Sequence, residues 1–382
     1  MFVEAALSLI VQQPLLQIST GDLTTLLYIV SVVVFMMVSL LWGTRIQVST
    51  MLAYLGRNLG KLQNFKDGSR KELLDYLTNV CRVQTKELQG EVDRMLDYFT
   101  IIPENIDPAG VVGKIEQVIR LRDERVKQEI KDLAPQADVI QRSVAENILE
   151  MAAFLLQIYK IIRHFYIQGQ KMKNPYMLAA AQMSLPILLK EAEACYGAIE
   201  TFKNAEPIGD GAGAMAVGKL MIGREKFKIA KDTVYAKSDY KGRTLYLVKA
   251  EGPMGAVGMP DEAVQKLLAD KSNGITIIIM IDAVLKLEGE TTGEIVQGIG
   301  AAIGGIGVEK FRIEEAATNN HVPMYAVVVR ETMLDNISVM TREIAEGASK
   351  ATDVVLNLIE KKTKESDGIL IVGVGNTLGV GQ

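Results

Sequence analysis

The sequence is poor in the residues on which several protein classes depend. Its 382 residues include two cysteines, two histidines and one tryptophan. Cys81 and Cys195 lie far apart and form no Cys-x-x-Cys pair. This argues against a disulfide framework or a zinc ribbon and fits a reducing compartment. The length corresponds to about two or three domains, so a sizeable buried core is expected.

The chain also lacks an excess of charge of either sign. It has 42 basic and 46 acidic residues, and its net charge is −4. Proteins that bind nucleic acid usually carry a concentrated positive surface, so the composition argues against a nucleic-acid partner. Hydrophobic residues make up 48% of the chain and charged residues 23%. This composition excludes a disordered chain and is compatible with a membrane segment.

One long apolar run lies near the N-terminus. Residues 23–42 read LTTLLYIVSVVVFMMVSLLW, twenty residues without a charge. At about 1.5 Å per residue, a helix of this length covers a hydrocarbon core of roughly 30 Å. No lysine or arginine precedes the run, which argues against a secretory signal peptide. We therefore predict a single transmembrane helix, with membrane lipid as a partner.

The charges beside this run predict its orientation. Only acidic residues, Glu4 and Asp22, precede it, whereas five basic residues follow soon after: Arg45, Arg57, Lys61, Lys66 and Arg70. The positive-inside rule therefore predicts a single-pass protein of the cell membrane with its C-terminal domains in the cytoplasm. Residues 1–20 are apolar but short and contain Pro14, so we expect an interfacial or re-entrant segment.

A helical bundle is predicted between the membrane segment and about residue 205. Glycine is scarce after Ser69, and apolar residues recur at helical spacing, as in Leu73, Leu77 and Val80. Breaks at prolines and at one glycine-containing stretch divide the region into about four helices. Pro186 marks an expected kink in the last of these helices. The predicted domains are residues 1–44, 45–205 and 206–382.

The composition changes near Pro207, where glycine becomes frequent and β-branched runs alternate with helical ones. This pattern predicts a three-layer α/β domain with a mostly parallel sheet covered on both faces. The whole chain is thus expected to be a membrane-anchored α plus α/β protein. The predicted strands are residues 232–236, 244–250, 275–281, 324–329 and 369–374, and the predicted helices are 214–221, 261–269 and 338–364.

Polar residues follow several of these strands. Glu251, Asp282 and Asn376 each lie just beyond an apolar run, and Asp210 lies in a glycine-rich turn that opens a helix. Ligands of parallel sheets bind beyond the carboxyl ends of the strands, so these residues are candidates for one site. A purely structural role is the alternative, with Asp210 as a helix N-cap and Asp282 as the cap of a turn or of the next helix. A nucleotide is not expected, because GDGAG puts a carboxylate where phosphate would bind.

Four segments of this domain resemble a known family. They are GDGAGAMAVGKL at 209–220, AEGPMGAVG at 250–258, IIIMIDAVLKLEGETTGEI at 277–295 and GVGNTLG at 373–379. They resemble the motifs of hydrogenase-maturation endopeptidases and, more distantly, of the spore-germination protease group. The G-x-G-N motif comes first in that family and last here, as in a circular permutation, which surface termini tolerate. The whole chain resembles an archaeal membrane-anchored family of unknown function.

The resemblance implies roles for individual residues. Asp210 and Asp282 match metal-binding carboxylates, and the third ligand of the maturation endopeptidases is a histidine, for which this domain offers only His321. In the germination-protease group the comparable carboxylates act without that histidine. The resemblance thus implies one divalent metal ion and a protein or peptide substrate. The expected substrate-binding residues are Gly211, Gly213, Glu251, Gly375 and Asn376.

Two functions from different classes fit this sequence. Paired aspartates can hold a divalent cation, or one can stay protonated while the other activates water. Asp210 and Asp282 are therefore predicted as the catalytic pair of a peptidase-like hydrolase. The alternatives are a non-catalytic, membrane-bound scaffold that forms a homo-oligomer, and a small-ligand sensor that uses the glycine-rich stretch 298–307.

Overall fold

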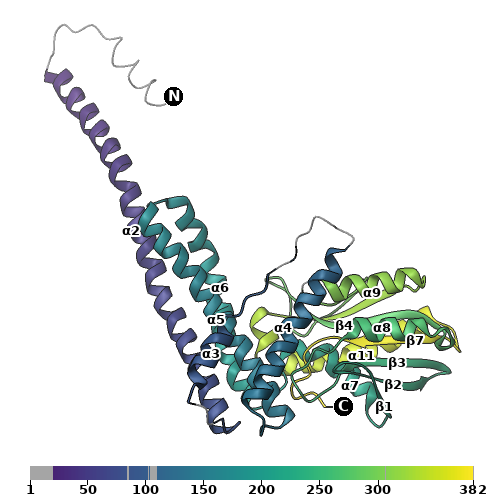
Figure 1. The fold of residues 1–382 in the computed structure, drawn as a ribbon. Coiled ribbons are helices and arrows are strands. Elements are labelled where there is room, and N and C mark those ends of the chain that lie inside the picture. The colour runs from purple at the N-terminus through teal and green to yellow at the C-terminus, as the bar shows by residue number, and fades with distance from the viewer. Residues whose placement is uncertain (1–19, 84–85, 102, 104–109, 306, 382) are drawn as a thin grey trace. The chain divides into compact units, whose positions relative to one another are not determined.

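The computed structural model describes residues 20–83, 86–101, 103, 110–305 and 307–381 (Figure 1). The chain forms two compact units. One unit contains Met1–Asn58 and Ile162–Leu185, and the other contains Leu59–Ile161 and Pro186–Gln382. The interfacial or re-entrant segment expected over residues 1–20 lies outside the described residues, apart from Thr20.

The N-terminal region is helical, as predicted. Helix α2 is 60 residues long and passes without a break through the predicted domain limit at residues 44 and 45. Helix α6 continues through Pro186. The helices are α2 (Thr20–Asn79), α3 (Leu88–Leu96), α4 (Val111–Leu133), α5 (Val139–Met172) and α6 (Pro175–Lys203).

In the first unit, the N-terminal part of α2 has a bare apolar surface. Leu27, Phe35 and Trp42 are 61%, 72% and 62% exposed, and among the side chains of α2 that the structure describes, the first buried apolar one is Val48. Among the described residues, α2 is the one helix long and apolar enough to cross a membrane. This agrees with the predicted position of the membrane segment.

In the second unit, the remaining parts of the long helices share one core. Leu77 of α2, Val92 of α3, Ile130 of α4 and Ile148 of α5 are fully buried together. Amphipathic stripes of this kind bury one side of each helix against its neighbours. Leu378, near the C-terminus, belongs to the same core, so the helical region and the α/β domain are packed together in this unit.

The α/β domain has a seven-stranded sheet in the order β1-β2-β3-β7-β4-β6-β5. The central strands β3, β7, β4 and β6 are parallel, whereas β2 and β5 pair antiparallel with their neighbours. The sheet is therefore mixed rather than mostly parallel. The strands are β1 (Lys226–Ala230), β2 (Thr233–Tyr240), β3 (Arg243–Ala250), β4 (Ile275–Leu285), β5 (Ile295–Ile299), β6 (Met324–Glu331) and β7 (Gly368–Gly373).

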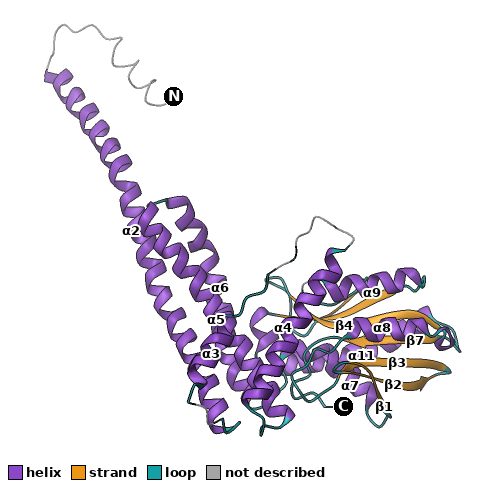
Figure 2. Cartoon of the chain, viewed as in Figure 1, coloured by secondary structure: helices purple, strands orange, loops and turns teal. Residues whose placement is uncertain are grey.

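Helices cover both faces of the sheet (Figure 2). Helices α7 (Ala212–Met221) and α11 (Arg342–Lys362) pack on one face, and α8 (Pro260–Ala269) and α9 (Val308–Asn319) pack on the other. All six residues of β7 are buried, which explains its continuous apolar sequence. Short helices complete the domain: η1 (Gly209–Gly211), η2 (Lys271–Asn273) and α10 (Met333–Ile337).

Candidate functional site

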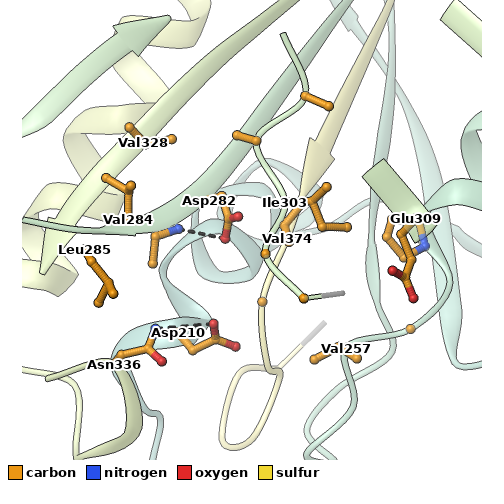
Figure 3. Close-up of a pocket in the computed structure, with 18 of the residues that line it drawn as sticks. Asp210, Val257, Asp282, Val284, Leu285, Ile303, Glu309, Val328, Asn336 and Val374 are labelled. Carbon is orange, nitrogen blue, oxygen red and sulfur yellow. Dashed lines mark hydrogen bonds between the residues drawn. The ribbon is translucent and has the colours of Figure 1, made fainter. Parts of the chain in front are cut away.

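A cavity of about 820 Å³ lies at the carboxyl ends of the central strands (Figure 3). Asp210 and Asp282 both line it, so the structure brings the two predicted aspartates to one site. Most of the remaining wall is aliphatic, and it includes Val257, Val284, Leu285, Ile303 and Val328. This edge of the sheet is where ligands of parallel strands bind.

Asp282 lies on β4, beside Val328 of the neighbouring strand β6. The residues before it, Ile277–Ile281, are buried, so the apolar run carries the aspartate into the domain. Asp282 itself is 7% exposed. Its Oδ1 accepts a hydrogen bond from the backbone N–H of Ala283 at 2.8 Å. No other protein donor is described for this carboxyl group.

Asp210 lies in η1, the turn that opens α7. Its Oδ2 accepts a hydrogen bond from the backbone N–H of Asn376 at 2.7 Å, and its Oδ1 accepts one from Nδ2 of Asn336 at 3.4 Å. The turn can approach the end of β7 because residue 375 is glycine. Gly375 has φ 117°, and a Cβ there would lie 1.8 Å from the carbonyl oxygen of Asp210.

A third carboxyl group, that of Glu331 at the end of β6, lies behind this turn. Its Oε1 accepts a hydrogen bond from Nδ2 of Asn336 at 2.6 Å, so one amide bridges Glu331 and Asp210. Glu331 is fully buried, and its Oε2 has no partner among the described residues. Sequence reasoning missed Glu331 and Asn336. Glu331 could have been found as Asp282 was, because it too is a carboxyl group at the end of an apolar strand.

Burial raises the pKa of all three carboxyl groups, but their surroundings differ. Burial raises the pKa of Asp282 well above its ordinary value, and the negative charges of Asp210 and Glu331 add to this. Burial raises the pKa of Glu331 to about 8. Burial also raises the pKa of Asp210, but hydrogen bonds from Asn376 and Asn336 favour its charged form. Asp210 is therefore the best placed of the three to be a carboxylate while Asp282 holds a proton.

The other predicted glycine and asparagine residues support the backbone around the site. A Cβ on Gly211 would lie 2.7 Å from the carbonyl oxygen of Asn376, and one on Gly213 would lie 2.2 Å from that of Ile281. Both glycines therefore permit close backbone packing, and neither lines the cavity. Asn376 serves Asp210 through its backbone, while its side chain accepts a hydrogen bond from the N–H of Leu378.

Two predicted residues are not brought to the aspartates. Glu251 forms an ion pair with Lys228, with 2.9 Å between Oε2 and Nζ, and does not line the cavity. His321 lies in the exposed turn before β6, at the end of that strand opposite Glu331. The strand alone separates these ends by roughly 23 Å, at about 3.3 Å per residue. A residue that precedes a parallel strand cannot join a site at its carboxyl end.

These positions bear on the predicted divalent ion. Among the described residues, no group of three or more histidine, cysteine, aspartate or glutamate side chains has an arrangement that could hold a metal. The cavity is lined by Glu309 and by two aspartates with raised pKa, and it lacks the histidine that the resemblance implies (Figure 3). Because these carboxyl groups do not form such a group, the donor set does not fit a resident metal ion.

The fold and the site define a class of protein with a helical N-terminal region, one helix able to span a membrane, and a mixed-sheet α/β domain with a carboxyl-lined cavity. Residues 28–205 match the family described as "Protein of unknown function (DUF1512) N-terminal domain", and residues 208–381 match "Domain of unknown function (DUF1512) C-terminal". The chain belongs to this two-domain family. No curated protein and no solved structure matches the chain.

Proposed function

We propose that this protein is a membrane-anchored, cytoplasm-facing hydrolase that cleaves a peptide bond with two carboxyl groups and no metal ion. The observation that carries the proposal is the pairing of Asp210 and Asp282 in one cavity with unequal surroundings. Pairs of carboxyl groups whose environments separate their pKa values are suited to acid and base roles. The archaeal origin and the peptidase likeness rest on the sequence resemblance alone.

The two aspartates divide the reaction between them. Protonated Asp282 donates a hydrogen bond to the carbonyl oxygen of the scissile bond, while the Asp210 carboxylate accepts a proton from the attacking water. The water oxygen bonds to the carbonyl carbon. When the C–N bond breaks, the proton held by Asp210 passes to the leaving nitrogen, and Asp282 ends with its own proton. Asn336 and the N–H of Asn376 hold Asp210 in place.

The cavity wall favours one class of substrate. Val257 and Leu285 are 60% and 50% exposed, and Val284 and Ile303 continue the aliphatic lining. These side chains suit an uncharged polypeptide segment with aliphatic residues beside the scissile bond. Acidic residues at those positions would be repelled by Asp210. A protein substrate near the membrane surface is consistent with the proposed anchor.

The proposal is tested with the full chain in lipid nanodiscs and a library of aliphatic peptides, with cleavage detected by mass spectrometry. Asp210→Asn and Asp282→Asn are each expected to lower cleavage by about 10²–10⁴-fold, the usual range for loss of a general acid or base. The matched control is Asp239→Asn, because Asp239 is exposed on β2. Circular dichroism establishes that all four proteins are folded.

Other outcomes distinguish the competing functions. Cleavage that a chelator abolishes and a divalent ion restores would replace this scheme with a metal-dependent one. Saturable ligand binding without cleavage would indicate the small-ligand sensor. An inactive wild-type chain that forms a defined homo-oligomer by mass photometry, unaltered by either aspartate change, would indicate the non-catalytic scaffold. Homo-oligomerisation is compatible with each of these functions.

A further inference from the structure

The turn between α5 and α6 is a fixed structure in the first unit. The backbone N–H of Lys173 donates to the carbonyl oxygen of Gly169 at 2.9 Å and closes the end of α5. Asn174 caps α6, since its Oδ1 accepts a hydrogen bond from the N–H of Tyr176 at 2.9 Å. Pro175 is the first residue of α6, a position that favours proline. The turn is therefore capped by hydrogen bonds on both sides.

The same turn lies near the end of the bare part of α2. A Cβ on Gly56 would lie 3.2 Å from the ring of Tyr166, and one on Gly169 would lie 3.2 Å from Cδ2 of Leu52. Helices α2 and α5 therefore run antiparallel here, and later residues of α5 meet earlier residues of α2 (Figure 1). One more turn of α5 reaches the level of Val48, the first buried apolar side chain that the structure describes in α2.

This level lies at the outer edge of the lipid headgroups. Val48 follows Trp42, the last residue of the apolar run, by six residues, which is about 9 Å along a helix. The headgroup layer extends roughly 5–8 Å beyond each side of the hydrocarbon core. With the apolar run of α2 in the hydrocarbon core, the backbone of the α5–α6 turn lies just outside the headgroup layer, so its long side chains reach into that layer, on the side that the positive charges predict to be cytoplasmic.

The side chains of the turn have the chemistry of a membrane interface. Met172 and Tyr176 are 61% and 85% exposed, although both are largely apolar. Lys171 and Lys173 are also exposed, and no acidic partner is described for either. Aromatic rings concentrate at the level of the headgroups, and lysines near that surface are attracted to anionic lipids.

Ordinary turn chemistry accounts for only part of this arrangement. A lysine such as Lys171 complements the carbonyl groups at a helix end. Lys173, however, has φ 51°, in the left-handed region where a helix usually ends with glycine or asparagine. Neither consideration explains why Met172 and Tyr176 are left uncovered.

We propose that the α5–α6 turn, residues 171–176, is a binding surface for anionic lipid headgroups beside the membrane helix. Lys171 and Lys173 contact the headgroup phosphates, while Met172 and Tyr176 insert at the boundary with the acyl chains. The proposal rests on the membrane anchor of the proposed function and is independent of the chemistry at Asp210 and Asp282. The turn and α2 together then bind the membrane at two points.

Because the chain has a single tryptophan, its fluorescence can test membrane contact separately at α2 and at the α5–α6 turn. In the unmodified chain, Trp42 alone reports on the anchor. In the double variant Trp42→Phe/Tyr176→Trp, the only indole is at position 176, where the exposed side chain of Tyr176 can be replaced without disturbing a core. Both proteins are reconstituted in nanodiscs of phosphatidylcholine with brominated acyl chains, with and without phosphatidylglycerol. Bromine quenches only indoles that reach the acyl chains.

We expect quenching of Trp42 in both lipids, and quenching at position 176 that is about twofold stronger with the anionic lipid. Lys171→Gln/Lys173→Gln is expected to reduce the position-176 signal to its level in phosphatidylcholine without altering Trp42. Lys190→Gln, an exposed lysine farther along α6, is the matched control and leaves both signals unchanged.

Two quenching results would overturn the proposal, and they differ in their meaning. Quenching of Trp42 without quenching at position 176 would leave the anchor in place and remove the headgroup surface. Absence of quenching at Trp42 would remove the anchor and the headgroup surface together. Hydrogen–deuterium exchange of the unmodified chain is a second measurement. Equal exchange of residues 171–176 in the two lipids would also contradict the proposal.

Discussion

At the scale of single residues, Glu331 makes the stability of the α/β domain depend on pH. Burial raises its pKa from 4.5 to about 8, so the folded state keeps a proton that the unfolded state releases. Between those two values the unfolded state binds fewer protons, and stability falls as pH rises. The contribution of Glu331 is fully present below its unfolded pKa and is lost as pH rises through about 8.

Glu331→Gln is expected to remove the loss of stability that occurs as pH rises. An amide keeps the hydrogen-bonding shape of the protonated acid and cannot ionise. We expect the variant to be more stable than wild type at pH 8.5, by about 2–4 kcal/mol in the free energy of unfolding, and similar to it at pH 5. Urea unfolding of the full chain at both pH values measures the difference. If wild type and Glu331→Gln differ in stability by the same amount at both pH values, the raised pKa of Glu331 is contradicted.

Lys249 on β3 has the opposite pH dependence. It is 1% exposed, and its Nζ donates to the carbonyl oxygen of Ala250 at 3.0 Å. Burial lowers its pKa from 10.5 to about 8. The unfolded state therefore binds more protons between pH 8 and 10.5, so stability rises with pH there, and charging the buried amine lowers stability below pH 8.

Lys249→Met removes the buried charge and keeps a similar side-chain volume. We expect it to raise the free energy of unfolding at pH 7 by about 1–3 kcal/mol and to have a smaller effect near pH 10. Thermal unfolding of the full chain at the two pH values is the measurement. A destabilised variant at pH 7 would show that the ammonium group has a partner that stabilises it.

The residues of the site were predictable where one strand determined their position. Asp282 follows an apolar run, and its place at a carboxyl end was evident from that run alone. Glu251 was predicted in the same way, because it follows β3, but it pairs with Lys228 and does not line the cavity. His321 was assigned through the resemblance, and it lies at the opposite end of β6. The bridge from Asn336 to Asp210 joins residues 126 positions apart, and no local pattern predicts such a contact.

At the scale of elements, helix α4 is held against the α/β domain by ion pairs. Glu116 of α4 pairs with Arg312 of α9 and, at 2.6 Å, with Arg120. Arg120 also pairs with Glu262 of α8 at 2.7 Å. The side chain of Glu116 is only 12% exposed, so this network is shielded from water more than an ordinary surface pair. Ile119 of the same helix lines the carboxyl cavity.

Glu116→Gln is expected to loosen α4. The change leaves two guanidinium groups without this carboxylate, and we expect a loss of about 1–3 kcal/mol in the free energy of unfolding. Hydrogen–deuterium exchange should increase in α4. The control is Glu124→Gln, whose partner Lys231 is 44% exposed, so its effect should stay below about 0.5 kcal/mol. Equal effects of the two changes would contradict a special role for Glu116.

Long periodic elements were predictable, and short edge elements were not. Five strands were predicted from the sequence, including β4 and β7, and all five are present in the structure. The edge strand β5 has five residues, of which one is glycine and three are exposed. The apolar pattern of β5 is too weak to distinguish this strand from a loop. Because β5 pairs antiparallel with β6, missing it led to the expectation of a mostly parallel sheet. Helix α2 was divided at residue 44, although no proline interrupts it there.

At the scale of the whole molecule, the distribution of charge beside the apolar run of α2 determines the orientation expected in a membrane. Two buried cysteines make this testable by labelling. Burial raises the pKa of Cys81 to about 11 and that of Cys195 to about 12, so both thiols are expected to stay unreactive at neutral pH. A cysteine placed at an exposed position is then the reactive one.

Two positions on opposite sides of the apolar run give reciprocal expectations. Lys350 is exposed on α11, and Asp22 is exposed just before the run. With a membrane-impermeant maleimide, Asp22→Cys should be labelled in intact cells, and Lys350→Cys only after the cells are opened. The opposite pattern would reverse the orientation and place the carboxyl cavity outside the cytoplasm. Labelling of both positions in intact cells would be incompatible with a membrane-spanning α2, and the unmodified chain establishes the background from the two native thiols.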